Sequence, residues 1–184
     1  MKNFEVVDKE TNKKHWISRS MAVTVVPVVI NKEGEVSVLV ETRGLGCPDN
    51  IGKHVFPCGY LDYDETLREA GARELYEEIG LKVKPENLIF FGINDDIKSN
   101  LQNVTARFVI VLDAEDILGK MDSKEINTDT KSRGGEENEV SEISLVPLSK
   151  YDDSEKWAFG HLEIAKSVIK NLAELIEGTY KPNV

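Results

Sequence analysis

The sequence predicts an α/β protein in which a mixed β-sheet lies between layers of helices. Three features predict it: β-branched apolar runs on both sides of a central helix, that short helix itself, and an amphipathic helix near the C-terminal end. The chain has 184 residues, of which 40% are hydrophobic, enough for one buried core and too few for two comfortable domains. We expect one domain at 21–178, an N-terminal extension at 1–20 and a tail at 179–184.

Five apolar runs are expected to form the sheet. The first, 21–30, is nearly continuous in Val and Ile, and Pro27 predicts a bulge or a break in its ladder. A turn containing Gly34 joins this run to the alternating run 36–43, so the two should form a hairpin. The remaining runs follow the central helix, at 88–95, 104–113 and 141–148.

Two helices are expected. Thr66 and Glu69 form a capping-box pattern at the start of the central helix, and Gly80 fits the left-handed residue that ends it. The segment 157–178 has apolar residues at helical spacing, so it should pack as a helix on the sheet. Between the helices, 114–140 contains the longest polar stretch without periodicity, and loops of this length in a compact domain are usually functional or disordered.

The central helix carries an unusual group of acids. Glu74, Glu77 and Glu78 fall within one arc of about 100°, and carboxylates at this spacing repel by roughly 1 to 3 kcal/mol per pair. Two of them lie in the last turn, where the helix dipole favours cations. A solvated acidic face is the ordinary interpretation of such a group. A bound divalent metal would instead reverse both penalties.

The residues around these acids decide between the two interpretations. From Gly59 to Leu81 the chain resembles the Nudix box at every fixed position: Gly59, Glu65, Arg73, Glu74, Leu75, Glu77, Glu78, Gly80 and Leu81. The sequence departs at Cys58, where the family usually has glycine, and at Gly71, where alanine is commoner. Glycine costs a helix up to about 1 kcal/mol relative to alanine, so we expect close packing of Gly71 against a strand.

The resemblance implies a Nudix hydrolase with an α/β/α sandwich fold. Such an enzyme cleaves the pyrophosphate link of a nucleoside diphosphate joined to another group, and it uses Mg²⁺ or Mn²⁺. Matched by position, Glu74, Glu77 and Glu78 are the implied metal ligands, and Arg73 is the arginine that positions them. The predicted strand at 141–148 resembles the late strand of Nudix proteins. In some family members a glutamate in the loop before that strand adds a metal ligand or acts as the base. Glu137 lies nearest to that place, with Glu136 and Glu139 as rivals.

The substrate is not fixed by the resemblance. Arg43 and Lys53 flank a glycine-rich loop at 44–54 and are candidate phosphate contacts, with a solvated surface role as the alternative. The loops at 44–54 and 114–140 and the N-terminal extension could line a larger binding site than a nucleoside triphosphate needs. ADP-ribose or a dinucleotide is therefore favoured over a nucleoside triphosphate. Phe159 to His161 resembles a Phe-x-His segment of some Nudix proteins, but His161 is expected to pack or cap a helix start.

The charge of the chain limits its partners. A formal charge of −10 and a pI near 4.9 argue against nucleic acid and anionic membranes. The expected partner is a small nucleotide, and the expected location is the cytoplasm, since we see no apolar leader or span. The N-terminal extension fits either an edge strand or an arm for a homodimer. A nucleotide-sensing module without hydrolysis, and an interaction protein with an incidental acidic helix, are the alternative functions.

Overall fold

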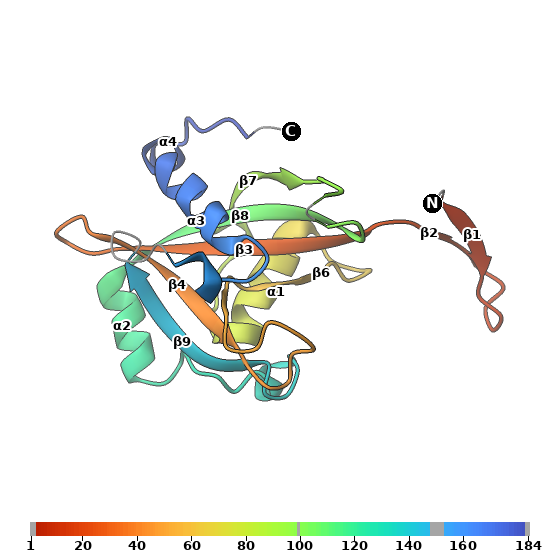
Figure 1. Ribbon diagram of the computed structural model, residues 1–184, viewed down its shortest axis with the longest axis horizontal. Helices are drawn as coiled ribbons and strands as arrows, with labels where there is room; N and C mark the ends of the chain where they lie inside the picture. The colour runs from red at the N-terminus through yellow and green to blue at the C-terminus, as the bar shows by residue number, and fades with distance from the viewer. Residues whose placement is uncertain (1–2, 99, 148–152, 183–184) are drawn as a thin grey trace.

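The computed structural model describes residues 3–98, 100–147 and 153–182. Within them a seven-stranded mixed sheet lies between helical layers (Figure 1), which confirms the predicted architecture. The strands of this sheet are β3 (Ser20–Ile30), β4 (Val36–Arg43), β5 (His54–Val55), β6 (Cys58–Tyr60), β7 (Ile89–Asn94), β8 (Asn103–Asp113) and β9 (Val140–Pro147). The helices are α1 (Leu67–Ile79), α2 (Ala114–Asp122), α3 (His161–Lys170) and α4 (Leu172–Glu177), with 3-10 turns at Pro85–Asn87, Lys131–Arg133 and Ser154–Lys156.

Strand β3 is the centre of the sheet. It pairs in parallel with β8 along its whole length, while its other edge pairs first with β6 and then with β4. The predicted break at Pro27 does not occur in the β8 ladder, where Pro27 pairs with Ile110 without a register shift. Proline lacks an N–H, and Pro27 falls where the other edge changes partner from β6 to β4.

The two faces of the sheet carry separate apolar cores. On the face covered by α1 and α2, the core includes Val25 of β3 and Leu75 of α1. On the opposite face, covered by α3 and α4, it includes Val26 of β3 and Leu162 of α3. Successive strand residues point to opposite faces, so one strand serves both cores. We call these the α1 face and the α3 face.

Helix α1 begins and ends as the sequence predicts. Thr66 and Glu69 form a reciprocal capping box, and Gly80 closes the helix with φ 81° and ψ 6°. A Cβ added to Gly71 would lie 2.9 Å from Leu88 Cδ1 and 3.0 Å from Val25 Cγ2. The expected close packing of Gly71 against a strand is therefore confirmed.

Two expectations about the second half of the chain need correction. The polar segment 114–140 is not all loop, because α2 occupies its beginning and Asp113 caps it by accepting the N–H groups of Glu115 and Asp116. The predicted helix at 157–178 begins later, at His161, and is divided at Asn171 into α3 and α4. The sequence did not predict α2 because most of its residues are polar. Ile117 is the large apolar side chain that it buries, and one such residue gives little periodic signal.

The N-terminal extension forms a hairpin of its own. Strands β1 (Phe4–Val7) and β2 (Lys14–Ile17) make a separate two-stranded sheet, which extends from one end of the body (Figure 1). Phe4 and Trp16 are 47% and 68% exposed. The extension is thus not an edge strand of the main sheet. Among the described residues, no helix has the length and apolar character needed to cross a membrane.

Candidate active site

Four carboxylates from three segments gather on the α1 face. Glu74 and Glu78 come from α1, Glu41 from β4, and Glu139 from the loop before β9. Glu41, Glu74 and Glu78 are buried, with 2%, 6% and 4% of their surfaces exposed. We call these four residues the carboxylate cluster. Sequence analysis missed Glu41, although strand alternation places it on the same face as the core residue Leu39.

Burial and mutual repulsion raise the pKa values of the four acids in the cluster. Loss of solvent, followed by the charge of Glu139, raises the pKa of Glu41 to about 8. Burial also raises the pKa of Glu74 to about 7, although Arg73 opposes the shift, and it raises the pKa of Glu78 well above its usual value. The pKa of Glu139 is raised for the same first reason. Such shifts are common where a ligand supplies the missing positive charge.

Arg73 links Glu65, the glutamate of the Nudix-box pattern that lies before α1, to the helix. Its Nε and Nη2 donate to the two oxygens of Glu65 at 3.0 and 2.7 Å, which is bidentate geometry. Its Nη1 donates to Glu74 at 2.6 Å and to Glu77 at 3.1 Å. The hydrogen bond from Arg73 holds the pKa of Glu65 below its usual range. Arg73 therefore fixes the orientation of three carboxylates.

Glycines bring the backbone close to these side chains. A Cβ on Gly59 would lie 2.1 Å from Glu74 Oε1, so the first glycine of the box is required by the carboxylate beside it. Gly134 has φ 105°, and a Cβ there would lie 3.0 Å from Glu77 Oε1. The backbone N–H of Cys58 donates to Glu78 Oε2 at 2.9 Å. Larger residues at 59 or 134 would displace glutamates of α1.

Two loops pack against each other at the edge of the cluster. The N–H groups of Gly44 and Gly46 donate to the carbonyls of Glu139 and Asn138 at 2.6 and 2.8 Å. A Cβ on Gly44 would lie 2.2 Å from the Asn138 carbonyl oxygen, and one on Gly46 equally near that of Glu137. The glycine-rich loop therefore accepts the later loop at a distance that only glycine allows, and this contact holds Glu139 in place.

Arg133 caps the end of α1 from a distant part of the chain. Its guanidinium donates to the carbonyls of Glu77 and Glu78 at 3.1 and 3.2 Å. Asn127 holds the same guanidinium through its side-chain and main-chain oxygens. This cation meets the negative end of the helix dipole, which no residue near α1 in sequence does. Sequence analysis missed Arg133 because it lies 55 residues from Glu78.

The predicted substrate contacts differ in their placement. Arg43 borders the carboxylate cluster, where its charge opposes the pKa increases of Glu41 and Glu139. Its guanidinium donates to Asp49 and lies 5.0 Å from the ring centroid of Phe159, which is 55% exposed. Lys53 is half-buried, and its carbonyl accepts the N–H of Arg43 at 3.0 Å.

The structure separates the three candidate loop glutamates. Glu137 is exposed and pairs with Lys131 at 2.6 Å, so it does not lie in the cluster. Glu136 is also exposed. Glu139 is half-buried, and its charge raises the pKa of Glu41, Glu74 and Glu78. The placement thus favours the rival Glu139 over Glu137.

His161 has the packing role expected of it. It is 4% exposed, its Nδ1 accepts the backbone N–H of Phe56 at 2.8 Å, and its ring stacks on that of Phe56. Burial lowers the pKa of His161 to about 3, and Arg107 and Arg43 add to the effect. The imidazole is therefore neutral and hydrogen-bonded, on the α3 face.

The carboxylate cluster has the chemistry of a divalent metal site. Glu41 Oε2 is buried and has no hydrogen-bond partner within the described part of the chain, and carboxylate oxygens are the ligands that Mg²⁺ and Mn²⁺ prefer. Within the described residues, no three acidic, His or Cys side chains are already arranged as a coordination group. Arg73 pairs with Glu74 and Glu77 there. The donor set therefore fits a metal, provided that these side chains shift.

Comparison with known proteins identifies the family. The model of the NUDIX domain matches residues 19–168. The chain belongs to the Nudix hydrolase family. The predicted resemblance is thus confirmed, and the helix with its three acids is the Nudix box of this protein.

Relatives of this Nudix protein are similar in part of the sequence and in fold. Phosphatase NudJ of Escherichia coli K12 is 41% identical over 66 residues, which are 35% of this chain and 39% of NudJ. The chain therefore spans about two fifths of the curated relatives that it matches. A mutT/nudix family protein from Listeria innocua has a TM-score of 0.63 at 22% identity, covering 89% of this chain and all of that one. The NUDIX domain of Shewanella oneidensis NrtR, solved with ADP ribose, has a TM-score of 0.60 at 16% identity, with coverages of 85% and 90%.

Proposed function

We propose that the protein hydrolyses the pyrophosphate bond of a nucleoside diphosphate joined to another group. The observation that carries this proposal is the carboxylate cluster, in which burial holds protons on several acids beside a complete Nudix box. If this group of buried acids had only a structural role, it would destabilise the fold with no compensating gain in function. Hydrolysis of a charged diphosphate would explain the cluster, because these carboxylates would hold a divalent metal that supplies the positive charge such a substrate needs.

Glu74, Glu77 and Glu78 would hold Mg²⁺ or Mn²⁺, and Glu41 and Glu139, whose charges act on Glu74 and Glu78, are candidates for further oxygen ligands. When bound, such a metal would supply positive charge for the diphosphate and activation of the attacking water. Arg73 keeps Glu74 and Glu77 oriented, and Arg133 holds the end of α1 through the carbonyls of Glu77 and Glu78. The missing side chain of Gly134 leaves room for the Glu77 carboxylate. The chain thus supplies carboxylates that Arg73 orients and that would shift to bind the metal beside the reacting phosphate.

Glu139 is our choice for the residue that accepts the proton of the attacking water. It reaches the carboxylate cluster from a loop, and burial raises its pKa toward the range useful for a general base. Glu137, the residue that sequence position favours, is neutralised by Lys131 at the surface. The base proposal therefore moves from Glu137 to Glu139, and it leaves open which phosphorus is attacked.

ADP-ribose or a dinucleotide is the favoured substrate, ahead of a nucleoside triphosphate. The exposed ring of Phe159 lies beside Arg43 at the edge of the cluster, and an aromatic face next to a guanidinium suits a base and its phosphate. Lys53 stays a second candidate for a phosphate contact. The bound ADP ribose in the NrtR NUDIX domain supports this class of ligand.

A second candidate is a nucleotide-sensing module that does not hydrolyse its ligand, since a similar NUDIX domain was solved with ADP ribose bound. The complete set of box glutamates favours hydrolysis over sensing. The acidic charge favours a small nucleotide over nucleic acid as partner. The exposed hairpin of β1 and β2 suits a homodimer contact, because an isolated two-stranded sheet is marginally stable by itself.

Turnover of a nucleotide panel tests the proposal. The full chain is assayed with ADP-ribose, dinucleoside polyphosphates and the common nucleoside triphosphates, with Mg²⁺, with Mn²⁺ and with EDTA. We expect metal-dependent release of a nucleoside monophosphate, with a higher kcat/KM for ADP-ribose or a dinucleotide than for any triphosphate. A higher kcat/KM for a triphosphate would correct the substrate class. Tight ADP-ribose binding without turnover under any metal condition would replace hydrolysis by sensing.

A further inference from the structure

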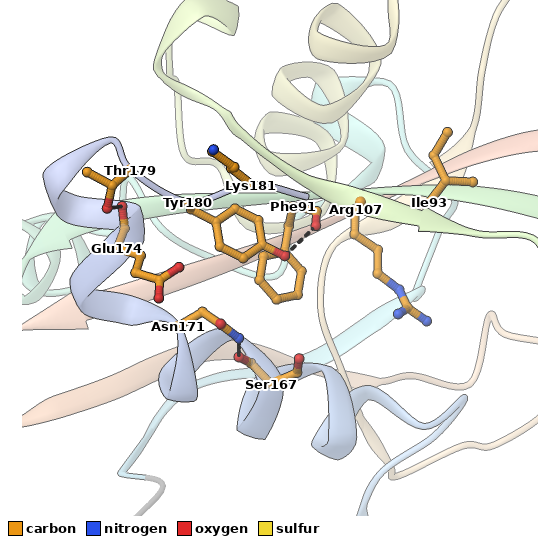
Figure 2. Close-up of a pocket in the computed structure, with 10 residues that line it drawn as sticks. Phe91, Ile93, Arg107, Ser167, Asn171, Glu174, Thr179, Tyr180 and Lys181 are labelled. Carbon is orange, nitrogen blue, oxygen red and sulfur yellow. Dashed lines mark hydrogen bonds between the residues drawn. The ribbon is translucent and has the colours of Figure 1, made fainter. Parts of the chain in front are cut away.

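Arg107 is a charged residue on the covered α3 face of the sheet. Its strand neighbours Ala106 and Phe108 belong to the core of the α1 face, so alternation turns Arg107 toward α3. Sequence alternation alone allowed an outward, solvated position for this side chain. The structure instead places it on the wall of a cavity between β7, β8 and the C-terminal helices (Figure 2).

One donor of the Arg107 guanidinium, Nε, is buried and has no hydrogen-bond partner within the described part of the chain. The sequence contains 33 acidic residues against 23 Lys and Arg, yet no ion pair of Arg107 is found within the described ranges. An unpaired buried donor of a charged group is costly. A polar atom of this kind in a native fold calls for an explanation, and an unbound ligand is one.

The cavity around Arg107 has the size and lining of a small-molecule site. Its volume is about 670 Å³, within the usual range for ligand pockets. Tyr180 stacks on Phe91 with ring centroids 5.0 Å apart and donates its hydroxyl to the Phe91 carbonyl at 2.9 Å, which fixes an aromatic wall. Figure 2 shows the Arg107 side chain on the same side of the sheet as Ser167 and Asn171 of the helical layer.

Polar groups around this aromatic wall suit an anion. Lys181 adds a second cation to the lining, and the Ser167 hydroxyl can donate a hydrogen bond. The Asn171 amide already donates to the Ser167 carbonyl at 2.7 Å and keeps a second N–H, while the Thr179 hydroxyl donates to the Glu174 carbonyl. Glu174 is the acid among the lining residues. A planar guanidinium presents parallel donors that match two oxygens of a phosphate. The volume exceeds that of a phosphate ion, so the organic part of a ligand would lie toward Tyr180.

We propose that this cavity binds the phosphate group of a small molecule, with Arg107 as its main contact, on the opposite face of the sheet from the carboxylate cluster. The site needs no metal, because its own cations supply the positive charge. It is independent of the proposed hydrolysis, since none of its lining residues belongs to the cluster. The inference adds a second ligand site to the protein.

The direct test observes the unpaired atom. In ¹⁵N-labelled full-length protein with EDTA, the Nε–Hε signal of Arg107, assigned by its loss in Arg107→Lys, is followed during titration with inorganic phosphate and with AMP. Chloride at matched ionic strength is the control. Both phosphates should shift this signal in a saturable manner, AMP at lower concentration. A signal that phosphate and AMP leave unchanged overturns the proposal.

Matched variants locate the site. Arg107→Gln should weaken AMP binding by about tenfold or more, the usual scale for a charged hydrogen bond, while Glu174→Gln should strengthen it by removing the nearby acid. Glu78→Gln, on the other face, should leave AMP affinity in EDTA unchanged. If Arg107→Gln fails to fold, the Glu174→Gln titration still decides, because equal AMP affinity in this variant and wild type contradicts the proposed site. A gain of affinity in Glu78→Gln, as expected when an acid beside a bound anion is neutralised, would place the anion at the carboxylate cluster instead and overturn the proposal.

Discussion

Glu41 on the α1 face and His161 on the α3 face are both buried titratable side chains, but we interpret Glu41 as part of a functional site and His161 as a packing residue. Burial holds each in its uncharged form, since the pKa of Glu41 is raised to about 8 and that of His161 is lowered to about 3. His161 accepts a hydrogen bond from Phe56, whereas Glu41 Oε2 has no partner in the described residues. A perturbed pKa thus indicates a functional site here only when an unsatisfied atom and like-charged neighbours accompany it.

The largest difference between the two faces is expected when an acid of the α1 face is neutralised. Glu78→Gln should lower kcat/KM for the best substrate by about a hundredfold or more, because it removes a proposed metal ligand. Steady-state kinetics with Mg²⁺ measure the effect, and circular dichroism checks the fold. The matched control is Glu163→Gln, an exposed change on α3. Wild-type turnover by Glu78→Gln would show that the α1 face is as structural as the α3 face.

The choice of base sharpens the comparison within the α1 face. Glu139→Gln should lower kcat by roughly tenfold to a hundredfold and flatten the pH dependence of the rate, since the group that accepts the proton is lost. Glu137→Gln and Glu136→Gln, at the surface of the same loop, should stay within about twofold. Rate profiles from pH 6 to 9 separate them. If all three variants behave like wild type, this loop has no part in catalysis.

On the α3 face the expected loss is of stability and not of activity. His161→Phe keeps an aromatic ring but leaves the Phe56 N–H unpaired, which should cost about 1 to 3 kcal/mol. The folded pKa of His161 lies below its ordinary value of 6.5, so its contribution is present above pH 6.5 and is lost as pH falls toward 3. Urea unfolding at several pH values should therefore show a weaker acid-side loss in the variant. A large fall in kcat for folded His161→Phe would contradict a packing role.

The smallest expected effect has the opposite pH dependence. The folded pKa of Glu41 lies above its ordinary value of 4.5, so its contribution to stability is complete below pH 4.5 and is lost as pH rises through about 8. In EDTA, Glu41→Gln should raise Tm at pH 8.5 by a few degrees relative to wild type, with a smaller gain at pH 5. Added Mg²⁺ should reverse the order at pH 8.5. Equal Tm curves for the two proteins would mean that Glu41 is not under electrostatic strain.

Local signals were enough to predict α1 and its caps, and longer-range contacts explain what was missed. Thr66, Glu69 and Gly80 act within one or two turns of the helix, so their roles follow from spacing alone. Arg133 contacts the end of α1 across 55 residues, and no spacing rule connects the two. Strand alternation could have placed Glu41 on the core face, but it could not have said which acids lie beside Glu41. Glu139 lies near Glu41 because the loop before β9 packs on the glycine-rich loop after β4.

The choice among the loop glutamates shows the same limit. Sequence position favours Glu137, but side-chain direction in an irregular segment depends on the hydrogen bonds of its backbone. The carbonyls of Asn138 and Glu139 face Gly44 and Gly46, and this contact directs Glu139 inward while Glu137 meets Lys131. Arg107 was ambiguous because alternation gives the face of a strand and not what covers it.

The parallel pairing of β3 with β8 also fixes when the protein can fold during its synthesis. β3 leaves the ribosome early, but its parallel partner ends at Asp113, and the loop that supplies Glu139 emerges later still. At roughly 5 to 20 residues per second, β3 and β4 wait for several seconds with their apolar faces uncovered. Chaperone demand should therefore be concentrated in that interval, and a stalled chain that ends before β8 should be a preferred substrate for proteolysis.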